Sequence, residues 1–450
     1  MFYPKTPFLV NPLLEADILK VNSAALAPLL EWLCLTPKVT TYRVNTLRCS
    51  VDDFRKKLEE KLAIRYGVKS PRIYCLPNLP EMLCIDPLDS QLTKAVADSE
   101  LKEVVVDTNC GAALLRGAHI YAPGVLAMES NTEREELVNV YADLDGKCKR
   151  GTVKRYESPN KVFLGTGKVL MQRYQLFNNA EKPASGVAVE MQSNVSGVPT
   201  LGDLSSEDGL LQNLPSIVCV RVLDPQPGER ILDMCAAPGN KTSHIAELMG
   251  DRGSVVALDN SASRVRSMLP KLGHYKSITA HVFNSTEAVA ADAPSAPVGE
   301  FTGPPFPCES FDRILLDAPC SGLGNRPQLS CSIKQVKVLS SYPHIQRRLF
   351  EQAVQLVRPG GILVYSTCTV TEDECECLVA WALRKFVELR LTDATPRWGG
   401  PGLPLPGFEA CKSRLLQRFG PSGANADTVG FFYCEVSENI NKFNFKKKKK

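Results

Sequence analysis

The sequence predicts an α/β protein whose C-terminal half is a doubly wound, mostly parallel β-sheet. From residue 229 onward, short apolar runs alternate with segments of helical periodicity, which is the pattern of parallel strands joined by crossover helices. Sheets of this kind bind ligands at the carboxyl ends of their strands. The polar residues that follow the apolar runs, and that we expect to meet at one edge, are Asp233, Asp259, Asn284, Asp317 and Ser366–Cys368.

The elements of this half follow in chain order. The expected strands are 229–234, 254–259, 277–283, 311–317, 361–367 and 430–436. The expected helices between them are 241–249, 261–272, 344–357 and 371–386. A stretch rich in proline and alanine at about 288–308 interrupts the alternation, and it predicts an inserted loop.

The N-terminal half has a different texture. A helical segment at 11–33 precedes a strand at 39–47, and a helix at 52–62 places Phe54, Leu58 and Leu62 on one face. Short strands between glycines then predict a compact β-rich module, followed by a linker rich in Gly, Ser and Asn at 178–210. The predicted division is an N-terminal region 1–102, a β-rich domain 103–195, a connector 196–228 completing the N-terminal region, an α/β domain 229–440 and a tail 441–450.

The composition is typical of a soluble globular protein. The chain has 450 residues, of which 44% are hydrophobic and 23% charged. The first twenty residues lack the basic start and apolar run of a secretory signal. No apolar stretch reaches the roughly 18 residues that span a bilayer. We therefore expect a cytoplasmic monomer with no membrane partner.

Cysteine spacing and net charge exclude two further classes. The chain has 16 cysteines without a CxxC pair, so we expect reduced thiols and no metal site. The net charge of +4 becomes −1 without the terminal run Lys446–Lys450. That run is either a basic tail or a translated poly(A) stretch, and we favour the second interpretation. Nucleic-acid binding must therefore come from a local patch.

One local patch is visible between residues 147 and 173. It holds a single acid, Glu157, and eight basic residues: Lys147, Lys149, Arg150, Lys154, Arg155, Lys161, Lys168 and Arg173. Such an excess suits phosphate binding. The alternative is a solvated lysine-rich hairpin, which is the commoner meaning of a charge run.

Three loops carry candidate chemistry. The first, Asp233–His244, leads from a strand through small residues into a helix, where backbone amides approach a ligand closely. The other two, Asp317–Gly322 and Ser366–Thr369, each place a cysteine just past an apolar strand. Cysteines at such positions are candidates for reactive thiols. Each loop alone is equally consistent with a structural connection between a strand and the next element. Two cysteines that border one crevice favour a catalytic function.

Three strings resemble the Sun-domain (NSUN) family of S-adenosylmethionine-dependent RNA cytosine-5 methyltransferases. They are CAAPGNK (235–241), ILLDAPCSG (314–322) and VYSTCT (364–369). The resemblance covers 39–62 and 210–436, and it implies a Rossmann-like class I methyltransferase fold. It further implies that RVNTL (43–47) is part of an N-terminal RNA-recognition region. The β-rich insertion is similar to a PUA domain.

The resemblance implies a mechanism with two cysteines. Carbon 5 of cytosine is a weak nucleophile, and addition of a thiolate to carbon 6 activates it. Cys368 matches the family's nucleophile, and Cys320 matches the cysteine that assists release of the product. Asp317 matches the acid that faces base and cofactor. For attack at neutral pH, Cys368 should need a lowered pKa.

The same resemblance assigns the cofactor site. Its matching positions are Cys235, Ala236, Ala237, Pro238, Gly239, Asn240, Lys241, Asp259, Asn284 and Asp317. Asn240 stands where the family has a second glycine, and asparagine tolerates left-handed backbone. Asn284 stands where the family has aspartate; its carbonyl can accept the adenine amino group, but without charge. We therefore predict weaker cofactor binding.

The PUA similarity implies a tRNA substrate, gripped near its 3′ acceptor end, with messenger RNA as a further candidate. The matching RNA-facing positions are Arg116, Tyr121, Lys149 and Arg150. Tyr121 suits stacking on an unpaired base, or a place in the core. Two alternatives remain at this point. One is a non-catalytic RNA-binding protein with a degenerate cofactor site, and the other is a DNA cytosine methyltransferase whose nucleophile is the cysteine of DAPC.

Overall fold

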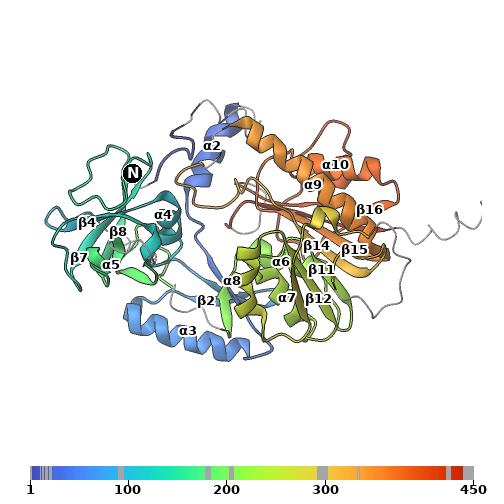
Figure 1. Cartoon of the computed structure of the whole chain (residues 1–450), viewed down its shortest axis with the longest axis horizontal. Helices are drawn as coiled ribbons and strands as arrows, with labels where there is room; N and C mark the ends of the chain where they lie inside the picture. Colours follow the sequence, from blue (N-terminus) through green and yellow to red (C-terminus); the bar gives the residue numbers. More distant parts are fainter. Residues whose placement is uncertain are drawn as a thin grey trace, which may run out of the picture.

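Three β-sheets make up the computed structural model, with the six-stranded sheet at one end and the eight-stranded sheet at the other (Figure 1). The structure describes residues 3–438 except 11, 13–14, 16–18, 20–22, 90–95, 178–183, 202–206, 291–302, 332, 334 and 422–426. The predicted tail 441–450 lies outside the described residues. Within the described part, no helix is long and apolar enough to cross a bilayer.

The eight-stranded sheet confirms the predicted doubly wound α/β architecture. Its strands in spatial order are β13 (Ile278–Val282), β12 (Ser254–Asp259), β11 (Arg230–Asp233), β14 (Phe311–Asp317), β15 (Val357–Thr367), β18 (Phe431–Glu438) and β16 (Leu389–Thr392), with β17 (Gln417–Phe419) beside β18. The first five are parallel, and β18 is antiparallel to both neighbours. Short β16 and β17 were not among the expected strands.

Helices cover both faces of this sheet. One face carries α6 (Leu214–Leu223), α7 (Asn240–Leu248) and α8 (Ala262–Leu272), and the other carries α9 (Val336–Leu356) and α10 (Glu376–Lys385), with α11 (Ala410–Leu415) beyond. Alternation along β14 shows the two-sided burial. Leu315 packs with the first group of helices, whereas Ile314 and Leu316 pack with the second. Fully buried strands of this kind are expected in a parallel sheet.

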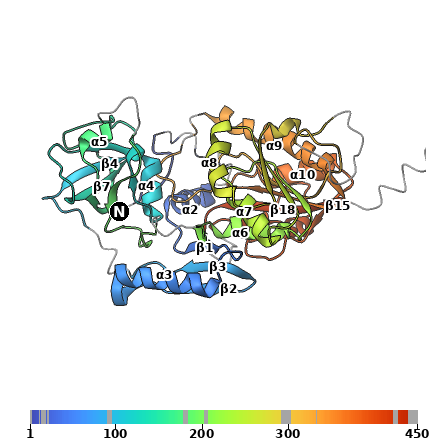
Figure 2. The same ribbon diagram turned by 60° about the horizontal axis from the view of Figure 1, so that its bottom comes forward.

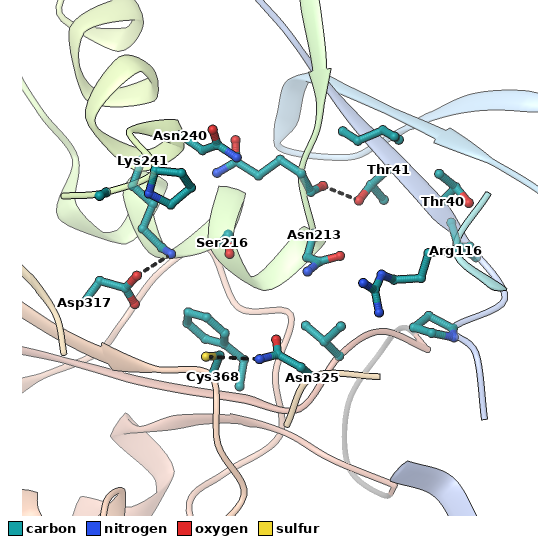
Figure 3. A pocket seen from close by; sticks show the side chains of 18 of the residues that line it. Thr40, Thr41, Arg116, Asn213, Ser216, Asn240, Lys241, Asp317, Asn325 and Cys368 are labelled. Atoms are coloured by element: carbon teal, nitrogen blue, oxygen red, sulfur yellow. Dashed lines mark hydrogen bonds and ion pairs between the residues drawn. The ribbon is translucent and has the colours of Figure 1, made fainter. Parts of the chain in front are cut away.

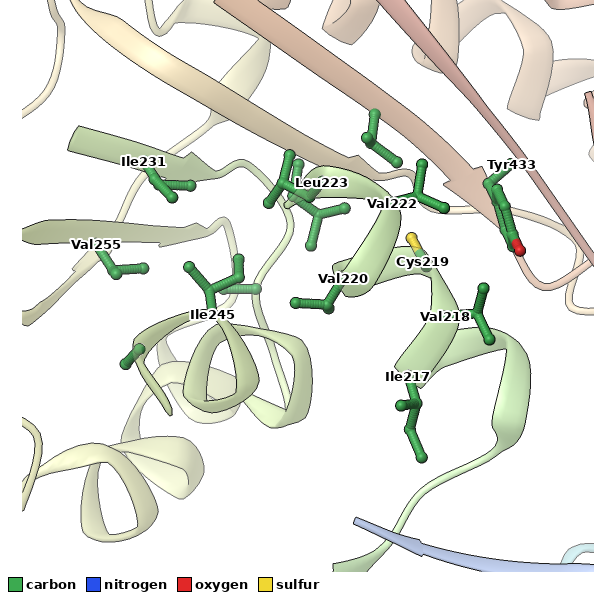
Figure 4. Packing of buried hydrophobic residues seen from close by; sticks show 14 of the residues in the cluster. Ile217, Val218, Cys219, Val220, Val222, Leu223, Ile231, Ile245, Val255 and Tyr433 are labelled. Carbon is green, nitrogen blue, oxygen red and sulfur yellow. The ribbon is translucent and has the colours of Figure 1, made fainter. Parts of the chain in front are cut away.

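Helix α6 lies in the range 196–228 that the sequence assigned to a connector. It packs against α7 and against strands β14, β15 and β18. Ile217, Val218 and Leu223 belong to the same core as Ile231 and Val255 (Figure 4). The range 196–228 therefore contributes to two parts of the fold. Helix α6 packs on the eight-stranded sheet, whereas β10 (Gly209–Leu211) joins the neighbouring four-stranded sheet.

The four-stranded antiparallel sheet has the order β10, β1 (Thr40–Val44), β3 (Leu79–Ile85) and β2 (Ile73–Leu76). Helix α3 (Val51–Tyr66) covers one face with Phe54, Leu58 and Leu62, as the periodicity predicted (Figure 2). Ser50 caps its start by accepting a hydrogen bond from the backbone N–H of Asp53. Met82 and Cys84 point to the other side, into the core that contains α6.

The six-stranded sheet is built from residues 102–191. Its strand order is β5 (Ile120–Tyr121), β9 (Val187–Met191), β8 (Lys161–Val169), β7 (Leu137–Asp143), β4 (Lys102–Val106) and β6 (Val125–Met128), with helices α4 (Thr108–Leu115) and α5 (Arg173–Phe177). The chain enters this body after β3 and returns to β10. Both strands pair with β1, and the N–H of Leu88 donates to the carbonyl of Gly197 across the two crossings at 2.8 Å.

Helix α2 (Ser23–Cys34) lies between the six-stranded and eight-stranded bodies (Figure 2). Leu30 and Leu33 pack against Leu323 and Val370, next to the two cysteine loops. Arg326 holds this corner together, since its guanidinium donates to the carbonyls of Trp32 at 2.7 Å and Thr428 at 2.7 Å. Helix α2 thus supports the segments next to the two cysteine loops.

Candidate active site

The carboxyl ends of β11, β14 and β15 open into a cavity of about 470 Å³ (Figure 3). Residues from the four-stranded sheet and from α4 complete its wall. The residues that bear on its chemistry are Arg116, Asp233, Cys235, Asn240, Lys241, Asp317, Asn325 and Cys368. The structure therefore brings together loops that are far apart in sequence, at the sheet edge that the strand pattern predicted.

The two loop cysteines lie side by side. Strands β14 and β15 pair so that Asp317 is opposite Ser366, and this register places the Sγ atoms of Cys320 and Cys368 3.3 Å apart. The hydrogen bond with Cys320 lowers the pKa of the Cys368 thiol, and Lys241 and Asn325 contribute, against the effect of burial. The same bond, together with burial, raises the pKa of Cys320. The lowered pKa of Cys368 fits its predicted role as the nucleophile of the pair.

A partly buried ion pair lies beside the thiols. The Nζ atom of Lys241 is 2.7 Å from Oδ2 of Asp317 (Figure 3). The hydroxyl of Ser366 donates to Oδ1 of Asp317 at 2.7 Å. Burial opposes the charge on Lys241, but Asp317, Cys219 and Cys368 together outweigh it, so that the pKa of the ammonium is raised. Lys241 and Asp317 both line the cavity beside the thiols.

The small-residue loop makes its turn at Gly239. This glycine has φ +92°, and a Cβ there would meet the side chain of Leu272 at 3.3 Å. Asn240 begins α7 and is not among the residues with positive φ. The tolerance of asparagine for left-handed backbone, which the sequence analysis invoked, is therefore not needed at this position.

Asp233 supplies the observation that tests the loop against S-adenosylmethionine. Its Oδ2 accepts a hydrogen bond from the hydroxyl of Thr242 at 2.8 Å, whereas its buried Oδ1 has no partner. The residue lines the cavity, and burial raises its pKa to about 7. An unpartnered carboxylate oxygen fits the ammonium of the methionine end of the cofactor. The residues present thus fit that group.

We expect Asp233 to make cofactor binding dependent on pH. Below about pH 7 the carboxyl holds a proton, so its attraction for an ammonium is lost and affinity should rise from pH 6 to pH 8. The cofactor-free protein should show the opposite trend, because an acid whose folded pKa lies above the reference value of 3.8 loses stability as pH rises toward 7. Melting curves and calorimetry of Asp233→Asn should be flatter in both respects; slopes equal to wild type would contradict this.

Asp259 and Asn284, which the resemblance assigns to the ribose and the adenine of the cofactor, do not line this cavity. Asp259 is buried at the end of β12, where Oδ2 accepts from the N–H of Ala237 at 3.2 Å and Oδ1 from the N–H of Ser261 at 3.0 Å. Arg264 pairs with the same carboxylate at 3.3 Å. Its assignment to the ribose stays a prediction, as does the helix-capping alternative, and both oxygens already have partners.

Asn284 is exposed and caps the short helix η4 (Ser285–Glu287). Its carbonyl accepts from the hydroxyl of Thr286 at 2.9 Å, and its amide donates to Glu287 at 3.0 Å. The side chain thus lies at the expected sheet edge but is occupied locally. An aspartate at position 284 would carry a second oxygen in place of the amide nitrogen. Among the described contacts, that oxygen would have no hydrogen-bond donor.

We expect Asn284→Asp to tighten cofactor binding and Asn284→Ala to weaken it, each by about fivefold. The reason is that a charged acceptor adds on the order of 1 kcal/mol to a hydrogen bond. Calorimetry with S-adenosylmethionine measures both changes. Thr286→Val is the control, since it removes the hydroxyl that donates to Asn284 and leaves the carboxamide. Unchanged affinity in both Asn284 variants would remove this residue from the site.

The predicted RNA residues divide into two groups. Arg116 is exposed at the end of α4 and lines the same cavity as Cys368. Tyr121, 49% exposed, lies with Lys149 and Arg150 on the six-stranded body. The guanidinium of Arg150 donates to the carbonyls of Pro123 at 3.0 Å and Val125 at 2.7 Å. Arg150 therefore stabilises the backbone at residues 123–125.

Among the described residues, four of the eight basic residues in the run 147–173 form ion pairs within the protein. Arg155 and Lys161 pair with Glu103, and Lys168 pairs with Glu135. Arg173 donates to the carbonyls of Met128, Gly151 and Thr152. Within the described chain, Lys149 and Lys154 alone of the eight have no ion pair or carbonyl partner. Glu103 is on β4 and Glu135 is in the turn before β7, so a charge count along residues 147–173 could not show these partners.

Sequence reasoning missed three residues around the site. Asn325 donates to the Sγ of Cys368 at 3.7 Å. Glu374 is fully buried behind the cysteine loops. Arg43, within the RVNTL string, is buried against α7 rather than exposed to RNA: it donates to Gln212 at 2.9 Å, to Ser243 at 2.7 Å and to the carbonyl of Asn240. The only sequence signal for Arg43 was its place in an apolar strand.

The fold and the loop after β11 define the class I methyltransferases that use S-adenosylmethionine. The profile of the family described as 16S rRNA methyltransferase RsmB/F matches residues 220–435. The tRNA (cytosine(72)-C(5))-methyltransferase NSUN6 of Mus musculus is 41% identical, over 96% of this chain and 94% of its own. The chain belongs to this family of S-adenosylmethionine-dependent RNA cytosine-5 methyltransferases.

Two archaeal relatives extend the comparison. The tRNA (cytosine(72)-C(5))-methyltransferase of Pyrococcus horikoshii is 31% identical, over 72% of each chain. The crystal structure of NSun6 from Pyrococcus horikoshii with SFG superimposes with a TM-score of 0.70 at 26% identity, covering 98% of this chain and 99% of that one. The likeness to the solved structure thus includes all three sheets.

Proposed function

We propose that this enzyme methylates carbon 5 of a cytosine near the 3′ acceptor end of tRNA, through Cys368 and Cys320. The observation that carries the proposal is the pair of thiols 3.3 Å apart beside a cavity that also holds Lys241 and Asp317. The relatives named for cytosine 72 of tRNA support the substrate. S-adenosylmethionine supplies the methyl group when bound.

Each side chain has a task in this proposal. The thiolate of Cys368 adds to carbon 6 of the cytosine, and the ring then becomes nucleophilic at carbon 5. Asp317, held by Lys241 and Ser366, accepts from the exocyclic amino group, while the Lys241 ammonium stabilises the negative charge that develops on the ring. Cys320 assists loss of the carbon 5 proton and elimination of Cys368.

The target base must leave its stack to reach the thiols, so a fraying end of the acceptor stem is favoured. We assign the six-stranded body to a PUA-type RNA grip, with Tyr121 and Lys149 as its RNA-facing residues. Arg116 stands between that body and the cavity, where it suits a phosphate of the strand that leads to the target. Messenger RNA as a second substrate, a monomeric state and a cytoplasmic location belong to the same proposal.

Bisulfite sequencing of tRNA incubated with the protein and S-adenosylmethionine tests this function. The expected result is one protected cytosine in the acceptor stem near the 3′ end. Protection at another position would overturn the substrate assignment. No protection, together with no cofactor binding by calorimetry at millimolar concentration, would favour the alternative of a non-catalytic RNA-binding protein.

We expect Lys149→Ala and Arg150→Ala to act differently. Lys149 is free to contact a phosphate, so its loss should weaken tRNA binding and reduce the salt dependence by about one ion. Arg150 satisfies backbone carbonyls, so its loss should cost roughly 1–3 kcal/mol of stability. Filter binding at several salt concentrations and urea unfolding measure the two effects. Lys61→Ala, on the exposed face of α3, is the control; equal effects from all three would contradict the assignment.

A further inference from the structure

Glu374 is a carboxylate buried behind the cysteine loops with no charged partner. Its residue exposure is 0%, and its carboxylate accepts hydrogen bonds from neutral donors alone among the described residues. Fully buried glutamates are rare unless they are paired. The burial of the Glu374 side chain without a positively charged partner among the described residues therefore requires an explanation.

The donors that satisfy Glu374 come from the residues next to both cysteines. Ser321, which follows Cys320, donates its backbone N–H at 2.9 Å and its hydroxyl at 2.6 Å. Thr369, which follows Cys368, donates its hydroxyl at 3.4 Å, and the hydroxyls of Ser321 and Thr369 lie 2.7 Å apart. One side chain thus connects the loop after β14 to the loop after β15.

Glu374 is itself held from two other elements. The amide of Gln346, on α9, donates to Oε2 at 3.0 Å and to the carbonyl of Pro319 at 2.9 Å. The hydroxyl of Tyr365, on β15, donates to the backbone carbonyl of Glu374 at 2.6 Å. The carboxylate is therefore held by α9 as well as by the two cysteine loops, and its backbone is held by β15.

We propose that Glu374 is a positioning residue that holds the two thiols together and keeps their shared proton on Cys320. A fixed negative charge disfavours a second negative charge nearby, and it bears on Cys320 more than on Cys368 because it binds the residue adjoining Cys320 at two atoms. Cys368 is then the thiolate, and the thiol of Cys320 donates to it. The inference rests on the proposed roles of the two cysteines.

Other groups around the thiols act in known directions. Asp317 disfavours and Lys241 favours a thiolate at Cys368, while Tyr342 and Tyr365 are neutral at physiological pH because burial raises the pKa of both phenols. Consistent with the proposal, Glu374 contributes to the raised pKa of Cys320, after the bond with Cys368 and burial, whereas the main influences on the pKa of Cys368 are Cys320, burial, Asp317, Lys241 and Asn325. None of these groups substitutes for Glu374 on the side of Cys320.

Thiol labelling with iodoacetamide tests the inference on the full chain without RNA or cofactor. The thiolate displaces iodide, and mass spectrometry reports which cysteine carries the carbamidomethyl group. Wild type should label at Cys368 in preference to Cys320. Glu374→Gln should reduce that preference by about three- to tenfold, as expected for a charge that one thiol feels more than the other. A wild type that prefers Cys320 would overturn the proposal at once.

A second variant and a matched control separate charge from folding. Gln346→Lys places an ammonium beside the carboxylate, and should reduce the preference in the same way even if Glu374→Gln fails to fold. Glu376→Gln changes an equally buried glutamate that pairs with Arg418 at 3.4 Å, and should leave the preference unchanged. A folded Glu374→Gln or Gln346→Lys with the wild-type preference would overturn the proposal, as would a control that shifts it equally. Expected labelling without RNA methylation would count against the proposed function alone.

Discussion

Replacement of Cys368 by alanine is expected to abolish methylation, whereas replacement of Cys320 should trap the enzyme on its RNA. Without Cys368 no adduct forms at carbon 6, and the rate should fall by on the order of a thousandfold or more, the scale seen when a nucleophile is removed. Without Cys320 the adduct forms but is released slowly. Denaturing gels with labelled tRNA and S-adenosylmethionine should then show a slow-migrating covalent species for Cys320→Ala.

The control for both variants is Cys411→Ala, which changes an exposed cysteine away from the cavity. It should retain wild-type activity and form no stable adduct. If Cys368→Ala accumulates the covalent species instead, the roles of the two thiols are reversed, as in the alternative with the nucleophile in DAPC. An adduct in neither variant would exclude covalent catalysis at this pair.

Substitution of Arg43 by methionine is expected to have the largest effect on stability. Its guanidinium is buried and bonds to Glu247 at 3.1 Å and to Ser243 at 2.7 Å. Removal of the cation leaves the buried carboxylate of Glu247 without its positively charged partner and bound only by the Tyr275 hydroxyl among the described contacts, which costs about 3–5 kcal/mol. Methylation should fall as well, because Arg43 also binds the carbonyl of Asn240, the residue before Lys241. Urea unfolding and initial rates measure the two effects.

Two further variants isolate the cause. Arg55→Met removes an arginine of α3 whose pair with Glu59 is exposed, and it should cost less than about 1 kcal/mol. The double variant Arg43→Met/Glu247→Gln should recover part of the lost stability, since the stranded charge is gone. If Arg43→Met unfolds at the same urea concentration as Arg55→Met, the bridge between the four-stranded sheet and α7 contributes little.

The sequence predicted the elements with a clear apolar pattern, which is a short apolar run for a buried strand and one apolar face for a helix. Strand and helix alternation from residue 229 gave the parallel strands and the cavity edge correctly, and Phe54, Leu58 and Leu62 gave α3. Helix α6 was missed because its buried residues lie all around it, from Leu214 to Leu223, and a helix that is apolar on every side has no periodicity to read. The helix expected at 371–386 begins only at Glu376, after a turn at 372–375 that ends with Cys375 in a non-helical backbone conformation.

The candidate site shows the same limit. Cys320, Cys368, Lys241 and Asp317 could be named because short strings carried them. Partners supplied by distant segments could not be named, such as the acid that pairs with Arg155 across the six-stranded sheet, or the α7 groups that bind Arg43. Those contacts depend on which surfaces meet in three dimensions, and a single sequence does not contain that information in any local pattern.

The route of the chain between the sheets has a consequence for substrate choice. A module attached by a single crossing can swing, but here the departing strand β3 and the returning strand β10 are both hydrogen-bonded to β1. This double tether, with the hydrogen bond from Leu88 to Gly197 across the two crossings, restricts rotation of the six-stranded body more than a single crossing would. If that body grips the RNA end as proposed, its distance from the thiols varies little, so the enzyme should select its cytosine by distance from that end and tolerate changes in the sequence between them.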